Sequence, residues 1–201
     1  FISNSVMRSM DSLVGNAGLL TKVYFPRQTL VYSAVLALVY DFAFELTVLL
    51  VIMLIAGGPT VLLFIPQLIA ITVLAAVFTT GLGMMLAIAS VYFRDISHLW
   101  QIFNQVWMYA SGVVFPLSML DQLQNRLFAQ GWQINGHPLP LTTTFRMNPA
   151  ELFLEAYRSC LYDFANPSLG VWLGCLGWAV LSFGLGRWVF SRYSARIVEE
   201  L

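Results

Sequence analysis

The sequence predicts an all-α integral membrane protein, folded as a polytopic bundle of helices. Of its 201 residues, 59% are hydrophobic and only 10% are charged, and the mean hydropathy is +0.76. A soluble domain of this length needs a more charged surface, whereas lipid accepts apolar side chains on every face of a helix. The chain also holds four apolar stretches, each long enough for the about 20 helical residues that cross a hydrocarbon core. We therefore expect a single transmembrane domain over residues 1–201.

The apolar stretches predict three spans within residues 31–119, at 31–56, 61–91 and 99–119, and a last span within 168–190. Gly57, Gly58 and Pro59 form a turn signal, so the first two spans are expected to pack as an antiparallel hairpin. Residues 1–30 are expected to be a cytoplasmic coupling region, 120–167 an external gate region and 191–201 a cytoplasmic tail. Because the chain opens at Phe1, we expect a further N-terminal part.

Basic residues beside the spans predict the orientation in the membrane, because Lys and Arg concentrate on the cytoplasmic side. Under this layout three basic residues adjoin the outer side: Arg126, Arg146 and Arg158. The larger group adjoins the side that we expect to be cytoplasmic, together with the C-terminus: Arg8, Lys22, Arg27, Arg94, Arg187, Arg192 and Arg196.

A short helix is expected in the outer region, beginning with Asn148 as N-cap and Pro149 as first helical residue, and ending near Asp163. About 15 residues reach only about 22 Å, which is too short to cross the membrane. Leu152, Phe153, Ala156, Tyr157, Cys160 and Leu161 recur at helical spacing, while Glu151, Glu155 and Arg158 hold another face. The pattern predicts a re-entrant or interfacial helix; an ordinary helix on the outer leaflet is the alternative.

Four segments in order, GNAGLLTKVYFPRQTL, VYDFAFEL, VYFRDISHLW and FRMNPAELFLEAYRSCLYD, resemble permeases of type-2 ATP-binding-cassette exporters. The branch that they resemble exports lipid-linked polysaccharides such as O-antigen, teichoic acid and galactan. The resemblance implies six spans per subunit, of which four are visible here. It also implies a homodimer in the bacterial cytoplasmic membrane, bound to a separate ATPase that holds ATP and Mg.

The resemblance further implies that a short cytoplasmic helix over residues 16–25 docks into that ATPase. The coupling residues would be Leu20, Lys22, Tyr24, Phe25, Pro26 and Arg27, with a second contact at Arg94 and Asp95. The alternative is an interfacial anchor in which Lys22 and Arg27 touch anionic lipid and Tyr24 sits among the headgroups.

Asp41 and Glu45 lie one helical turn apart near the middle of the first expected span, where charge is costly and indicates function. Two such carboxylates are not both ionised and unpaired in a low dielectric, so either one is protonated or a cation reaches them. Arg158 is a candidate partner. A polar pair that locks the spans together is an equal alternative to a place in the substrate path.

Trp100, Phe103 and Trp107 share one helix face, and Tyr109 and Phe115 lie further along the same expected span. The resemblance implies that Trp107, Tyr109 and Phe115 line the substrate path and stack on sugar rings; belt or packing roles are the alternative. Separately, Gly170, Gly174 and Gly177 form a small-residue stripe on the last span, which predicts close helix packing.

The sequence holds no phosphate-binding glycine loop, so any ATP must be hydrolysed by a partner. His98 and His137 fall on opposite sides of the expected topology, so we expect no metal site, and no nucleic acid is expected as a partner. The leading hypothesis is the permease of a lipid-linked glycan exporter. A permease of the same class for a drug or lipid is one alternative. A membrane-embedded glycan enzyme using Glu151, Glu155 or Asp163, and a scaffold subunit, are the others.

Overall fold

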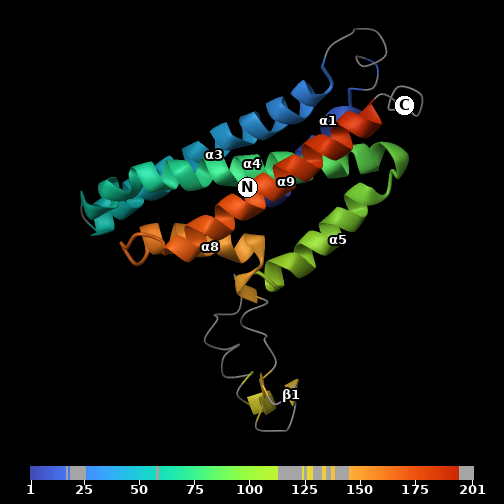
Figure 1. Ribbon diagram of the computed structural model, residues 1–201. Helices are drawn as coiled ribbons and strands as arrows, with labels where there is room; N and C mark the ends of the chain where they lie inside the picture. Colours follow the sequence, from blue (N-terminus) through green and yellow to red (C-terminus); the bar gives the residue numbers. More distant parts are fainter. Residues whose placement is uncertain are drawn as a thin grey trace.

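The computed structural model describes residues 1–16, 18, 26–57, 59–112, 124, 126–128, 133–134, 137–138 and 145–194. The protein is an α-helical polytopic membrane protein, as predicted (Figure 1). Its elements are α1 (Ile2–Val14), α3 (Gln28–Gly57), the 3-10 helix η1 (Pro59–Phe64), α4 (Ile65–Tyr92), α5 (Ile96–Tyr109), α8 (Pro149–Leu161), α9 (Leu169–Tyr193) and the antiparallel strands β1 (Gln133–Ile134) and β2 (His137–Pro138).

Three helical segments among the described residues are long and apolar enough to cross a membrane. They are Gln28–Ile55, Thr60–Tyr92 and Leu169–Tyr193, with hydropathies of 2.3, 2.6 and 1.7. They correspond to the first, second and fourth predicted spans. At the third predicted span, 99–119, the structure describes the 14-residue helix α5, which ends at Tyr109. A turn follows at 110–112, and residues 113–119 lie outside the described part. A helix of 14 residues extends about 21 Å, less than the hydrocarbon core.

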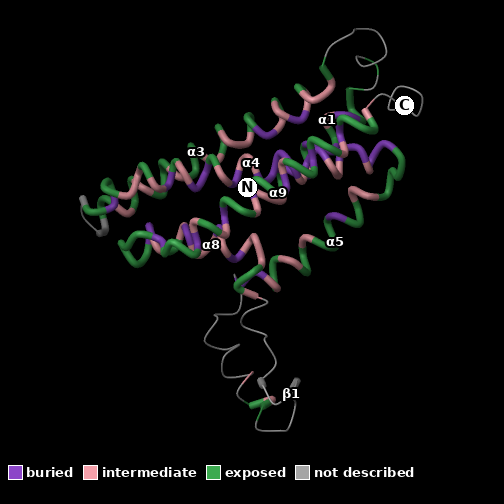
Figure 2. Tube along the Cα trace, viewed as in Figure 1, coloured by how far each residue is buried: buried purple, intermediate pink, exposed green. Residues whose placement is uncertain are grey.

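Helix α4 is the centre of the bundle and packs against α1, α3, α8 and α9. Buried residues concentrate along it, whereas α3 and α5 are mostly exposed or intermediate (Figure 2). A fully apolar helix such as α4 has no amphipathic stripe, so packing with its neighbours depends on shape more than on hydrophobicity.

Small residues let α9 cross α4 with backbones almost in contact. A Cβ on Gly186 would lie 2.2 Å from the carbonyl oxygen of Gly81, and a Cβ on Gly81 would lie 2.3 Å from the Ser182 carbonyl. The Ser182 hydroxyl donates to Phe78 O at 2.8 Å, so the crossing also has an interhelical hydrogen bond. On the opposite contact of α4, a Cβ on Gly83 would lie 2.6 Å from Ser9 Oγ of α1.

Of the predicted glycine stripe on α9, only Gly174 packs closely against another described helix. Gly174 packs against α8, where a Cβ would lie 2.8 Å from Leu152 Cδ1. Around Gly177 no described atom lies within 4 Å, and Gly170 has only Ser168 Oγ nearby, at 3.9 Å. The close crossing instead uses the Ser182-x-x-x-Gly186 pattern one and a half turns further on, which the sequence analysis missed.

One apolar cluster joins α1, α3, α4 and α9 at a single end of the bundle, and includes Leu13, Val31, Met84 and Phe190. The chain enters α3, turns from α4 into α5 and leaves α9 at this end, on the right in Figure 1. The segments that carry Arg27, Arg94 and Arg192 therefore lie together. This agrees with the predicted grouping of basic residues, and the assignment of this end to the cytoplasm stays a prediction.

We predict that Gly186→Ala destabilises the protein while Gly184→Ala does not. The added methyl at 186 collides with the Gly81 backbone, and overpacking of this kind costs about 1–3 kcal/mol. Position 184 has open space around it among the described atoms, so it is the matched control on the same helix. Thermal unfolding of both variants in mild detergent measures the effect. Equal unfolding midpoints would contradict the crossing described here.

Candidate functional site

Polar side chains converge where α5 ends and α8 begins, and Asn148 is the residue that joins the two helices. Its Oδ1 accepts from the Trp107 indole Nε1 at 2.8 Å, and its Nδ2 donates to Ala110 O at 2.9 Å. The same Oδ1 accepts from Ala150 N at 3.1 Å, which confirms Asn148 as N-cap with Pro149 at the first helical position. One side chain thus starts α8 and ties it to the last turn of α5. We name this contact the α5–α8 junction.

The backbone of the junction turns through Gly112, which has a left-handed φ of 66°. Arg158, two turns along α8, donates from Nη2 to Gly112 O at 3.2 Å. A Cβ on Gly112 would lie 2.4 Å from Glu151 Oε2. Glycine is therefore required at 112 both for the backbone conformation and for space above the carboxyl.

Glu151 is buried in the junction, with 1% of its surface exposed. Within the part of the chain that the structure describes, its Oε2 has no hydrogen-bond partner. Burial raises the pKa of the Glu151 carboxyl above its ordinary value; the Arg158 charge opposes this rise and the Glu155 charge adds to it. The sequence analysis placed Glu151 on a polar face with Glu155 and Arg158, which is wrong for Glu151. The first turn of α8 lies against the 110–112 turn, so this side chain is covered while Arg158 stays exposed.

A cavity of about 350 Å³ adjoins the junction between α1, α3, α4, α5 and α8. Its lining combines aromatic rings with a few polar groups and includes Phe42, Asn104, Trp107, Ser111, Phe153 and Tyr157. The Tyr157 hydroxyl lies 2.9 Å from Thr72 Oγ1 of α4, which fixes that ring at the cavity wall. Such a lining suits a ligand with apolar faces and scattered hydroxyls.

The aromatic residues of α5 form a row on one face, as their spacing predicts. The ring centroids of Trp100 and Phe103 lie 5.6 Å apart, and those of Phe103 and Trp107 lie 5.7 Å apart. Trp100 is buried, Trp107 lines the cavity, and Phe103 is 54% exposed. Tyr109 is also exposed, while Phe115 lies outside the described residues.

The structure does not bring the acidic pair and Arg158 together. Asp41 and Glu45 are both exposed on α3, and in the described part of the chain neither forms an ion pair. Between them in sequence, Phe42 points inward and stacks against Phe1 and Tyr157, with centroids at 5.1 and 5.8 Å. At this level the inward-facing side chain of α3 is Phe42, while among the described residues neither acid contacts Arg158 as an ion pair.

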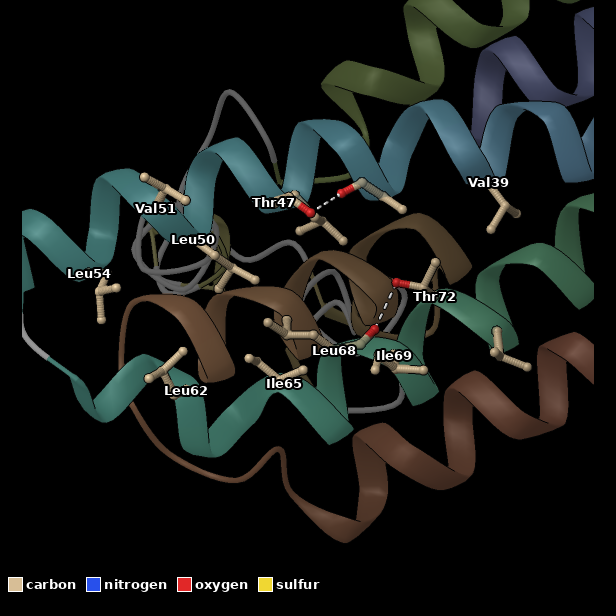
Figure 3. A pocket seen from close by; sticks show the side chains of 13 residues that line it. Val39, Thr47, Leu50, Val51, Leu54, Leu62, Ile65, Leu68, Ile69 and Thr72 are labelled. Atoms are coloured by element: carbon tan, nitrogen blue, oxygen red, sulfur yellow. Dashed lines mark hydrogen bonds between the residues drawn. The ribbon is translucent and has the colours of Figure 1, made fainter.

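A larger groove of about 530 Å³ runs between α3 and α4 (Figure 3). Its lining is aliphatic apart from Thr47 and Thr72, whose hydroxyls donate to Ala43 O and Leu68 O of their own helices, each at 2.7 Å. With its polar atoms already satisfied, this groove suits hydrocarbon and carries no reactive group.

The predicted coupling residues are only partly within the described structure. Leu20, Lys22, Tyr24 and Phe25 lie outside it. Pro26 is exposed just before α3, and Arg27 is half-buried beside it. In the turn between α4 and α5, Arg94 and Asp95 are exposed, and Asp95 is the N-cap residue of α5.

We predict a graded loss of stability at Asn148. Asn148→Ala removes the cap and both bonds to α5 and should cost about 2 kcal/mol. Asn148→Asp keeps the cap and the acceptor for Trp107, losing only the donor to Ala110 O, so its loss should be smaller. Thermal unfolding in detergent, followed by tryptophan fluorescence, gives the order. Equal losses for the two variants would contradict this prediction, because they would mean that the cap and the Trp107 bond, which only Asn148→Asp keeps, add no stability.

Comparison with known proteins identifies the family of this chain. Residues 1–129 match the profile of the ABC-2 type transporters. The O-antigen export system permease protein RfbA of Myxococcus xanthus is 29% identical over 171 residues, which cover 83% of this chain. The chain spans 58% of the length of that relative. Because the family profile matches more than half of the chain and the helices are those of a polytopic membrane protein, the chain belongs to the ABC-2 type transporter family.

Proposed function

We propose that this chain is the permease subunit of an ATP-driven exporter that moves a lipid-linked polysaccharide across the bacterial cytoplasmic membrane. The family match supports a transmembrane permease, and the name of the Myxococcus relative supports a polysaccharide as substrate. The C-terminus would lie in the cytoplasm, with the end of the bundle that carries Arg27, Arg94 and Arg192.

We infer the substrate class from the aromatic row of α5, which lies next to a cavity with polar groups. Sugar rings have apolar faces that pack on aromatic side chains, and their hydroxyls need donors and acceptors such as Asn104 and Tyr157. Phe103 and Trp107 offer ring faces from the same helix at spacings of 5.7 Å. We propose that Trp107, Tyr109 and Phe115 belong to the substrate path.

The acidic pair supports a polar path beside α3. Asp41 and Glu45 lie near the middle of a 30-residue apolar helix and are exposed there. A carboxylate facing lipid at this depth costs about 3 kcal/mol or more, so this face would adjoin water, substrate or a second copy of the chain. We propose that the working unit is a homodimer with these acids, and with Arg158, along the path.

ATP hydrolysis would take place in a separate ATPase that binds ATP and Mg. The contacts would be residues 20–27 and the turn with Arg94 and Asp95. Of these, Pro26 and Arg27 lie just before α3, at the same end of the bundle as the turn from α4 into α5 (Figure 1). Closure of the ATPase on nucleotide would then act on Pro26 and α3 directly.

A second candidate is a permease of the same class that exports a drug or lipid. The apolar groove between α3 and α4 favours it, because a hydrophobic substrate could enter this groove from the side (Figure 3). The two substrates would bind at different sites. A glycan would stack on the aromatic residues of α5, whereas a drug or lipid would occupy the groove between α3 and α4.

We predict that Tyr24→Ala and Phe25→Ala release the ATPase from the purified full-length permease. These substitutions remove apolar anchors from the proposed docking helix. Co-purification in mild detergent, with ATPase assays, measures the loss. Tyr162→Ala is the control, because Tyr162 is 82% exposed and follows α8, at the opposite end of the bundle. Retention of the ATPase by all three variants would place the contact elsewhere.

We predict that Phe103→Leu lowers glycan export about 2–10-fold, while Phe103→Trp keeps it, because only the second retains a stacking face. Phe103 is half exposed, so neither change should alter the unfolding temperature much. Export is measured as glycan delivered to the outer face of cells. Equal export by both variants would favour the drug or lipid alternative.

A further inference from the structure

The buried carboxyl of Glu151 has no part in the stacking or coupling described above. It lies under Gly112, where the missing side chain leaves just enough room, and its Oε2 finds no donor among the described residues. A second glutamate on α8, Glu155, is only half-buried one turn away. Natural proteins seldom bury an acid with an unpaired oxygen, so this position needs a physical explanation.

The charge state of Glu151 decides whether the α5–α8 junction is stable. A neutral carboxyl loses modest hydration when it is buried, whereas an ionised carboxylate without donors costs several kcal/mol. Arg158 offsets only part of this cost, because it is exposed and its Nη2 is bonded to Gly112 O. Glu155 adds a repelling charge.

Among the described residues, no other charge is found to act on the Glu151 carboxyl; Arg146, just before α8, lines a separate groove with Leu152. The 110–112 turn above Glu151 contributes Ala110, Ser111 and Gly112, none of which is charged. Of the other titratable side chains described on or against α8, Tyr157, Cys160 and Cys175 bring no charge in their neutral forms. Arg158 and Glu155 are thus the described charges that act on the carboxyl.

We propose that Glu151 is a proton-binding site that controls the α5–α8 junction. With the proton bound, the neutral carboxyl fits beneath Gly112, and Asn148 and Arg158 hold α8 against the end of α5. When the proton passes to water, the carboxylate leaves the contact to become hydrated, and the bonds to Ala110 O and Gly112 O break. That this release would open the export path rests on the proposed function; the proton site itself does not.

The direction of the pH dependence follows from the closed state binding the proton more tightly than the open state does. The closed junction keeps its full stability below the ordinary pKa of a solvated glutamate, about 4.3. It weakens as the pH rises from there to the raised pKa of the closed state, and then changes no further. Release of one proton limits the change to about tenfold in the open fraction per pH unit.

A cysteine reporter in the junction tests this in the full-length permease. Ser111 is 3% exposed, so a Ser111→Cys thiol should react with maleimide only when the junction opens. Cys160 and Cys175, both buried, are replaced by alanine in every variant. Labelling rates are compared between about pH 5 and pH 8 in three backgrounds: Glu151, Glu151→Gln and Glu155→Gln. The ratio to Glu151→Gln removes the ionisation of the reporter thiol itself.

We expect the ratio of labelling rates, Glu151 over Glu151→Gln, to rise with pH by up to about tenfold per unit. Glu155→Gln should keep the rise. Parallel pH profiles for Glu151 and Glu151→Gln, or loss of the rise in Glu155→Gln, would overturn the proposal. If Glu151→Gln does not fold, Glu155→Gln decides: removing the repelling charge must move the transition of the Glu151 protein to lower pH, and an unmoved transition overturns the proposal. No glycan or ATPase is needed, so failure here is separate from failure of the proposed function.

Discussion

The close crossing of α4 and α9 at Gly81 and Gly186 holds the helical bundle together. Helices in lipid gain little from hydrophobic burial against one another, so close backbone contact and interhelical hydrogen bonds must hold them. Here the contact leaves no room for a Cβ, and the Ser182–Phe78 bond lies beside it. With α9 fixed on α4, Gly174 of α9 can receive Leu152, and this places α8 against the bundle.

The α5–α8 junction meets a different constraint, since both helices end beside irregular backbone within a membrane protein. A buried backbone carbonyl without a hydrogen-bond partner is costly, so the carbonyl groups of this turn need partners. Asn148 and Arg158 satisfy Ala110 O and Gly112 O, respectively, and Glu151 fills the space under Gly112. The same compactness makes the junction sensitive to any charge placed inside it, which connects its packing to its control.

Three surfaces of the described structure differ in chemical character. The α3–α4 groove is aliphatic, the α5 row is aromatic, and the exposed face of α3 carries two acids. Hydrocarbon, sugar and water are the media that suit these three surfaces. The proposed substrate, with a lipid and a polar part, would use all three surfaces.

Several features follow from local chemistry and could be predicted from the sequence: the apolar lengths of α3, α4 and α9, the Asn148–Pro149 start of α8 and the aromatic face of α5. Helix length, capping and periodicity are properties of neighbouring residues, so they can be read along the chain. Only the tertiary structure decided that Glu151 is buried, that Arg158 bonds Gly112 and not Asp41, and that Gly186, not Gly177, meets α4. Each of these contacts is made with an element that is distant in the sequence. The residue spacing within one helix does not predict which atoms of another helix or turn will lie next to it.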